Sequence, residues 1–318
     1  MRKIIAAVAA TFLCATPVLA QSDFPNQPVR IVVGFAPGGG MDTIARMLGE
    51  KLAGPLGQQV IVDNRPGAGG TIAAAYAANE RPDGYTLYLS ETSALIGPVI
   101  YDNVGYDPIT SFVPVAHLTT APMALVANPS LEAGNMAEFI ELAKAKPGEY
   151  FYATPGVATV QHLGVEMLAA AAGIELEDAP FQGGAPSVAA VVSGEVPLAI
   201  TSLNAAVAQA QGGKVKILGI TSSERLPDFP DLPAISETVT GFAASPSQFL
   251  MAPANTPAEV VEKLSKAVEE SMNNPELVKA FSAQGFIPNY KSGTDLAAEL
   301  PATTAQWTEA AKALDKTN

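Results

Sequence analysis

The residues best suited to binding chemistry lie in a glycine-rich loop near the start of the chain. Residues 35–40, with the sequence FAPGGG, follow the β-branched stretch Val29–Val33 and precede a helical pattern from Asp42. A strand, a glycine loop and a helix start direct free backbone N–H groups and the positive end of a helix dipole at one point. We therefore expect an anion to bind here. A plain tight turn between strand and helix is the alternative.

The spacing of the loop residues restricts the kind of anion. The loop lacks the lysine of the G-x-x-x-x-G-K-[ST] motif, and the third glycine of a G-x-G-x-x-G motif would fall on Thr43. A nucleotide phosphate is therefore disfavoured, and a carboxylate is favoured. Asp42 is placed to cap and orient the first turn of the following helix.

A second group of candidate residues follows the third predicted strand. The strand 85–89 ends at Ser90, Glu91 and Thr92, and a second glycine loop, 64–70, follows the strand 59–63. In a doubly wound sheet, the carboxyl ends of these strands share one edge with the first loop. The side chains that follow the third strand are therefore candidate ligand contacts, with capping of the next segment as the alternative.

Groups that support catalysis are scarce in this sequence. The chain has two histidines, His117 and His162, and contains neither a G-x-S-x-G nor an H-E-x-x-H motif. Its one cysteine, Cys14, belongs to the predicted signal peptide, so no thiolate remains for a nucleophile or a metal. His162 follows a predicted loop and is a candidate ligand contact, with packing at a helix start as the alternative. We expect no enzyme activity, no cofactor and no metal site.

The N-terminus predicts export to the periplasm. Arg2 and Lys3 precede an apolar run over 4–14, and the sequence VLA at 18–20 is typical of a cleavage site, so residues 1–20 are interpreted as a signal peptide. The apolar run is too short to span a bilayer, and we expect no membrane insertion. The chain has a formal net charge of −13, which becomes more negative when the basic signal peptide leaves. This charge disfavours nucleic acid and anionic lipid as partners.

The order of predicted elements indicates an α/β fold. Strand and helix patterns alternate along most of the chain, which is typical of doubly wound, mostly parallel sheets. The pattern restarts near residue 150, with glycine-containing loops at 154–159 and 181–186, and this predicts two lobes. We place two crossover strands near 122–128 and 245–253. One domain then contains residues 21–123 and 249–318, the other contains residues 124–248, and the crossovers form a hinge.

Three segments carry a resemblance to a known family. They are VRIVVGFAPGGGMDTIAR at 29–46, NRPGAGG at 64–70 and RPDGYTLYL at 81–89. They closely resemble the periplasmic solute receptors of tripartite tricarboxylate transporters, the Bug receptors. The resemblance implies a two-lobed periplasmic binding protein fold (type II-like) that closes in the manner of a Venus flytrap on a small carboxylate. It also implies that the loop 35–42 grips one ligand carboxylate.

The resemblance also implies the partners of the protein. We expect a monomer that delivers its carboxylate ligand to the membrane permease subunits of a tripartite tricarboxylate-type transporter. Presentation of the bound ligand to a membrane sensor kinase is the alternative, and the sequence does not separate the two. An α/β enzyme is the third interpretation.

The second lobe departs from the family pattern, which leaves the far end of the ligand open. The family's Asn-Gly-Ser, Tyr-Lys-Gly and Trp-Tyr segments correspond here to VAT at 157–159, FQG at 181–183 and SQ at 247–248. An Asp of the family is replaced by Thr201, and a usual Thr is replaced by Glu91.

Three kinds of ligand fit these departures. The first is a monocarboxylate or aromatic acid with an apolar far end, and the second is an amino-bearing acid whose ammonium group meets Glu91. The third is a linear dicarboxylate that accepts hydrogen bonds from Thr159, Thr201 and Ser202. Alternatively, Glu91 faces solvent. The residues assigned to the ligand site are Phe35, Ala36, Pro37, Gly39, Gly40, Asp42, Ser90, Glu91, Thr92, Gly156, Thr159, His162, Gly183, Thr201, Ser202 and Gln248.

Overall fold

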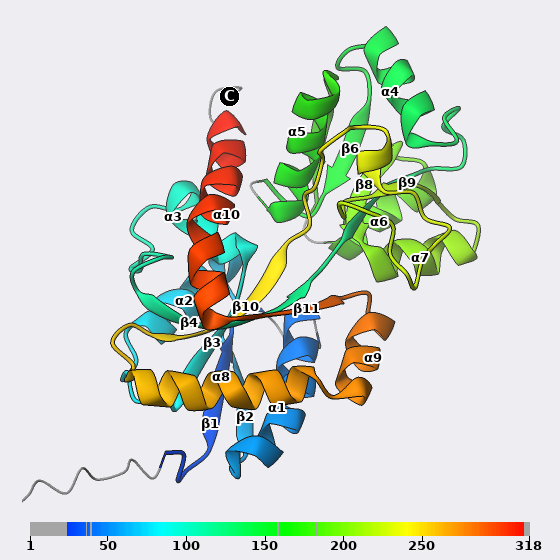
Figure 1. Ribbon diagram of the computed structural model, residues 1–318. Helices are drawn as coiled ribbons and strands as arrows, with labels where there is room; N and C mark the ends of the chain where they lie inside the picture. The colour runs from blue at the N-terminus through cyan, green and yellow to red at the C-terminus, as the bar shows by residue number, and fades with distance from the viewer. Residues whose placement is uncertain (1–23, 36, 39, 158, 182–183, 315–318) are drawn as a thin grey trace, which may run out of the picture.

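The computed structural model describes residues 24–314, except for positions 36, 39, 158, 182 and 183. The predicted signal peptide, residues 1–20, lies outside this described part. The described chain forms two α/β lobes, each built around one β-sheet (Figure 1). The long C-terminal helix lies beside both lobes.

The first lobe is built around a sheet of six strands among the described residues, in the order β11-β4-β10-β3-β1-β2. These strands are β1 (Val29–Val33), β2 (Val60–Asn64), β3 (Thr86–Glu91), β4 (Phe112–Thr120), β10 (Ser247–Pro253) and β11 (Ile287–Ser292). β1 pairs in parallel with both β2 and β3. Every residue of β1 except Arg30 is buried, as expected for a strand that is covered on both faces.

Helices cover both faces of this sheet. They are α1 (Gly40–Leu56), the 3₁₀ helix η1 (Ala68–Gly70), α2 (Thr71–Ala78), α3 (Thr92–Ile100), α8 (Ala258–Met272), α9 (Pro275–Ala283) and α10 (Gly293–Leu314). Ile44 of α1 and Leu264 of α8 share one buried core with β1. Ala73 of α2 and Leu95 of α3 belong to the core on the opposite face.

The second lobe is smaller and has the same layered form. Its sheet has five strands among the described residues, in the order β7-β6-β8-β5-β9. They are β5 (Met123–Ala127), β6 (Phe151–Thr154), β7 (Glu177–Pro180), β8 (Leu198–Ser202) and β9 (Lys216–Ile220). The helices are α4 (Met136–Ala145), α5 (Val160–Ala172), α6 (Gly184–Ser193), α7 (Leu203–Gln211) and the 3₁₀ helix η2 (Ile235–Glu237). Helices α4 and α5 pack in one core, and α6 and α7 pack in another.

The chain crosses between the lobes twice. β4 of the first sheet leads through Ala121 and Pro122 into β5 of the second, and the chain returns through residues 243–246 into β10. The predicted α/β, two-lobed architecture is confirmed. The predicted domain boundaries, at 123/124 and 248/249, lie close to these crossings and stay a prediction.

One detail of the predicted fold is wrong, because the sheets are not mostly parallel. Of the nine strand pairs in the described part of the chain, four are parallel and five are antiparallel. The crossovers explain the difference. β4 carries the chain out of the first lobe and β10 carries it back, so these neighbouring strands must run in opposite directions.

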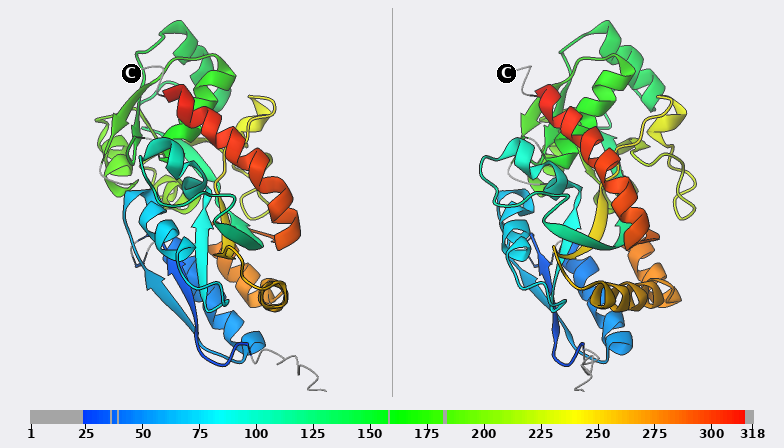
Figure 2. Two further views of the ribbon diagram at one scale, coloured as in Figure 1. Left: turned by 90° about the vertical axis from the view of Figure 1, so that its left-hand side faces the viewer. Right: turned by 60° about the vertical axis from the view of Figure 1, so that its left-hand side comes forward.

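Helix α10 joins the lobes by packing rather than by chain connection. Its first half contributes Leu296 and Leu300 to a core of the first lobe, whereas Trp307 and Ala311 of its second half belong to a core of the second lobe. Pro301 lies between the two halves. Figure 2 shows α10 running past α3 toward the second lobe. A relative movement of the lobes must therefore either bend α10 or break one of its contacts.

Candidate ligand site

A cavity of about 510 Å³ lies between the lobes, where the chain crosses from one to the other. This volume is within the usual range of small-molecule sites, about 300–1,000 Å³. The first lobe and the crossing segments contribute Phe35, Pro37, Gly40, Met41, Gly69, Glu91, Ser93, Ile96, Ile100, Tyr101, Ala121, Pro122, Pro246, Gln248, Gln284, Gly285 and Phe286. The second lobe contributes Met123, Thr159, Val160, Gln161, Ser202, Leu203 and Asn204.

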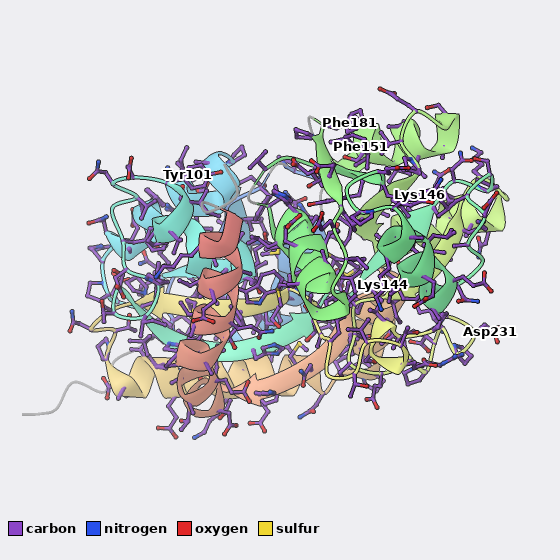
Figure 3. All side chains as sticks on the ribbon, turned by 90° about the horizontal axis from the view of Figure 1, so that it is seen from above. Tyr101, Lys144, Lys146, Phe151, Phe181 and Asp231 are labelled. Atoms are coloured by element: carbon purple, nitrogen blue, oxygen red, sulfur yellow. The ribbon has the colours of Figure 1, made fainter. Side chains whose placement is uncertain are left out.

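Tyr101 is an exposed aromatic residue of the cavity lining. It follows α3 directly, lines the cavity and is 40% exposed. Figure 3 places Tyr101 on the first lobe, whereas the other labelled residues, among them Phe151 and Phe181, lie on the second. The first lobe therefore contributes an exposed aromatic residue to the cavity lining.

Four helices of the described chain begin at the cavity, two from each lobe. Gly40 is the first residue of α1, and Glu91, Thr159 and Ser202 directly precede α3, α5 and α7. All four residues line the cavity. The first N–H groups of a helix have no partner within the helix, and the helix dipole is positive at this end. The cavity therefore receives positive potential from both lobes through backbone groups.

The start of α5 is held in place by its capping residue. The Oγ1 atom of Thr159 accepts a hydrogen bond from the backbone N–H of His162 and donates one to the carbonyl oxygen of Gly156 at 2.8 Å. Ser202, at the equivalent position before α7, makes no such capping hydrogen bond. Its side chain is exposed and lines the cavity, so this hydroxyl is a candidate ligand contact.

Asp42 organises the glycine loop in a way that differs from the prediction. We expected it to cap the first turn, but α1 begins earlier, at Gly40, and Asp42 is a buried residue inside that turn. Its Oδ2 atom accepts a hydrogen bond from the N–H of Gly38 at 2.8 Å and another from Nε of Arg46 at 2.9 Å. The hydrogen bond from Arg46, helped by that from Gly38, holds the pKa of Asp42 below its usual value against the effect of burial. Asp42 therefore ties the loop to the helix and does not line the cavity.

Glu91 lines the cavity and is half-buried. Burial raises the pKa of Glu91, while the hydrogen bond from Oγ of Ser93 to its Oε1 at 2.7 Å acts in the opposite direction. The alternative that Glu91 faces open solvent is therefore wrong.

The structure brings about half of the predicted site residues to the cavity. Those that line it are Phe35, Pro37, Gly40, Glu91, Thr159, Ser202 and Gln248. Those that lie in the described structure without lining it are Asp42, Ser90, Thr92, Gly156, His162 and Thr201. Ala36, Gly39 and Gly183 lie outside the described residues.

The residues that do not line the cavity are occupied in the surrounding structure. Thr92 is buried and accepts a hydrogen bond from the N–H of Ser247 at 2.9 Å, which fixes the returning crossover. His162 is buried beside the ring of Tyr152, and burial lowers its pKa. Thr201 lies next to Ser202 in β8, and successive side chains of a strand point to opposite faces. Its side chain therefore lines a separate hollow beside α6.

Several cavity residues were missed by the sequence reasoning. Gln284, Gly285 and Phe286 precede β11, far along the chain from the loop at 35–42. Across the cavity, Nδ2 of Asn204 donates a hydrogen bond to the carbonyl oxygen of Gln284, so this segment touches the second lobe. No local pattern distinguishes these residues. Only the position of β11 beside β4 brings them to the cavity.

The fold and the site together define a two-lobed binding protein with its ligand cavity between the lobes. The chain belongs to the tripartite tricarboxylate transporter receptor family, because the protein-family model described as "Tripartite tricarboxylate transporter family receptor" matches residues 44–315. BugT of Bordetella pertussis (strain Tohama I) is 34% identical over 282 residues, which cover 88% of this chain and 86% of BugT. The family is one of receptors, so the chain is a receptor rather than an enzyme, as predicted.

Two solved structures of similar proteins carry ligands in their names. Rpa4515 of R. palustris with adipate is 31% identical, with a TM-score of 0.78 and coverage of 91% of this chain and 98% of that protein. MatC from Rhodopseudomonas palustris with bound malate is 30% identical, with a TM-score of 0.76 and coverage of 91% and 100%. These similarities confirm the predicted two-lobed periplasmic binding protein fold.

The described residues contain neither a cluster of metal-ligand side chains nor a helix that could span a membrane. Within residues 24–314, less the five positions not described, no three His, Cys, Asp or Glu side chains cluster as metal ligands would. In the same part of the chain, no helix combines the length and the apolar character needed to cross a membrane.

Proposed function

We propose that this chain is a periplasmic receptor that captures a small carboxylate between its lobes and delivers it to the permease of a tripartite tricarboxylate-type transporter. Membership of the receptor family supports the transport role. Adipate and malate, named with two similar structures, are both carboxylates, which supports this class of ligand.

The observation that carries the proposal is the convergence of four helix starts on one cavity. Each start offers backbone N–H donors and a positive dipole end, and such sites bind carboxylates without a cationic side chain. Among the described lining residues there is no Lys, Arg or His. A carboxylate therefore finds its donors in the backbone and in neutral side chains such as Ser202.

Ligand binding and lobe closure are coupled in this proposal. Helices α1 and α3 belong to the first lobe and α5 and α7 to the second, so full coordination of a ligand requires both lobes. A ligand that interacts with both lobes stabilises the arrangement in which they are close together. The hydrogen bond from Asn204 to Gln284 joins the lobes in that arrangement. We propose that the ligand contacts are Phe35, Pro37, Gly40, Glu91, Thr159, Ser202 and Gln248.

The test is thermal unfolding of the mature protein, first unfolded and refolded to remove ligand, with a panel of carboxylates. The panel contains mono-, di- and tricarboxylates, aromatic acids and amino acids, each paired with its neutral amide as a control. A ligand at one hundred times its dissociation constant stabilises by about 2.7 kcal/mol. For a protein of this size, that amounts to a shift in Tm of roughly 5 °C or more.

The outcomes separate binding from delivery. A shift with an acid and none with its amide supports the carboxylate site, whereas no shift with any acid contradicts it. Delivery is tested by uptake of the labelled ligand into cells that contain the permease, with and without this receptor. Uptake that does not depend on the receptor contradicts the transport role.

A further inference from the structure

The charge of the cavity lining is unexpected for a site that binds an anion. Glu91 is the one carboxylate among the described lining residues, and no Lys, Arg or His accompanies it there. Its described hydrogen-bond donor is the neutral hydroxyl of Ser93. No cation of the described chain forms an ion pair with Glu91.

The position of Glu91 in the fold also leaves its carboxylate without a cationic neighbour among the described lining residues. It precedes α3, and its side chain does not cap that helix. In the register of the sheet it lies opposite Gln248, which is neutral and also lines the cavity. The amide oxygen of Gln248 accepts a hydrogen bond from Thr119. The neighbours of Glu91 thus include polar groups and the start of α3, but no cationic side chain of the described cavity lining.

Two negative groups in one cavity repel each other strongly when water is excluded. A dicarboxylate would place one carboxylate near the starts of α1, α5 and α7 and its second carboxylate in the space that Glu91 borders. A purely apolar far end would leave the charge of Glu91 partly buried without a counter-charge. A ligand with a positive group at this place avoids both costs.

We propose that the ligand is an amino-bearing carboxylate whose carboxylate lies at the starts of α1, α5 and α7 and whose ammonium group pairs with Glu91, before α3. This inference rests on the proposed function, because it assigns the other end of the same ligand. The apolar lining residues Ile96, Met123 and Phe286 surround the remaining carbon atoms of the ligand. The ligand class is therefore an amino acid with its amino group on the α-carbon or at the end of the chain.

The first experiment compares ligands that differ only in the far group. Hexanoate, 6-aminohexanoate and adipate have similar length and end in a methyl, an ammonium and a carboxylate group. Phenylalanine and leucine are compared in the same way with 3-phenylpropanoate and 4-methylpentanoate. Calorimetric titration of the refolded, ligand-free protein should give at least tenfold tighter binding for an amino-bearing member than for its matched acids.

The second experiment removes the charge of Glu91. Glu91→Gln keeps the shape of the side chain, and it should weaken the amino-bearing ligand at least tenfold, which is about 1.4 kcal/mol. The binding of matched acids without an amino group should improve, because the cost of a repelled or unpaired Glu91 carboxylate is removed. Glu195→Gln removes the same charge at an exposed position and should change neither affinity. Glu91→Asp keeps the charge and serves as a second variant if Glu91→Gln does not fold.

The results distinguish this inference from the proposed function. If dicarboxylates or apolar acids bind best and Glu91→Gln leaves the order of ligand affinities unchanged, the inference is overturned. The proposed function as a carboxylate receptor would then still hold. A second contrary result is a dicarboxylate that binds tightly at low pH and more weakly as the pH rises. That result would show that Glu91 is protonated in the complex, and it would also overturn the inference. If no carboxylate of any class binds, the proposed function fails as well.

Discussion

The hydrogen bonds of Asp42 connect Gly38 of the glycine loop to α1, and replacing this residue tests whether the site depends on that connection. Asp42 is 3% exposed and binds both the N–H of Gly38 in the loop and the guanidinium group of Arg46 in the helix. Its second oxygen, Oδ1, is buried without a hydrogen-bond partner among the described residues. Asp42→Ala removes both bonds and frees the loop from α1. We expect lower stability and weaker ligand binding.

The size of the effect follows from how far each partner is buried. A hydrogen bond to a charged group contributes about 1.5–3 kcal/mol, and the bond from Gly38 is shielded from solvent on the side of Asp42. The side chain of Arg46 is 55% exposed, so water screens its ion pair with Asp42. Asp42→Ala should therefore cost about 2 kcal/mol, most of it from the bond to Gly38. Arg46→Ala, the matched control, should cost much less.

The pH dependence of stability provides an independent check. The pKa of Asp42 in the folded protein lies below its ordinary value of 3.8, so the unfolded chain binds the proton more readily. The stabilisation by Asp42 is then fully present above that value and is lost as pH falls through the folded pKa. The difference between the wild-type protein and Asp42→Ala should be constant from about pH 5 to 8 and should shrink below about pH 4.

Urea unfolding of the ligand-free protein measures these stabilities, and calorimetric titration with an identified ligand measures the affinities. We expect a larger rise in Kd for Asp42→Ala than for Arg46→Ala, because only the first change releases the loop. Equal stability losses for the two variants, together with unchanged affinity, would refute the role assigned to Asp42. The loop would then keep its form through its own backbone.

Two further predictions concern the contacts around the site. A Cβ atom at Gly34 would lie 2.7 Å from Cα of Gly70, so Gly34→Ala should push the two glycine loops apart, cost about 1–3 kcal/mol and weaken ligand binding. Gly54→Ala, at an exposed position of α1 with no atom within 4 Å, should instead stabilise by about 0.5–1 kcal/mol, and thermal unfolding of both variants checks this contrast. Trp307 is the one tryptophan of the sequence and packs in the second lobe from α10, so its fluorescence should change when ligand closes the lobes. If calorimetry shows that the ligand binds but the fluorescence spectrum stays unchanged, α10 moves together with the second lobe.

Local sequence patterns were sufficient to predict the loop and the architecture. The stretch from Val29 to Asp42 combines a β-branched run, consecutive glycines and a helical pattern, and each of these is a property of neighbouring residues. The structure contains the strand and the helix at these places. The alternation of such units along the chain was enough to predict two α/β lobes.

The remaining errors arise where long-range packing decides the outcome. Thr201 and Ser202 are adjacent, and a shift of one residue in a strand exchanges the two faces, so a prediction of the strand alone does not tell which residue meets the ligand. Phe286 reaches the cavity because β11 pairs with β4, which the sequence does not indicate. The antiparallel pairs likewise follow from the path of the two crossovers rather than from any local pattern.

The construction of the site also suggests how receptors of this fold come to select different ligands. Helix starts bind a carboxylate through backbone groups, which most substitutions leave unchanged, so this part of the site discriminates little between acids. Discrimination must come from side chains that meet the rest of the ligand, and the cavity lining of this chain offers Glu91, Ile96 and Phe286 for this role. Of these, Glu91 alone carries charge, and a charge that must be paired rejects unsuitable ligands more strongly than an apolar contact does. Substitution of Glu91 should therefore alter the choice of ligand while the carboxylate requirement persists.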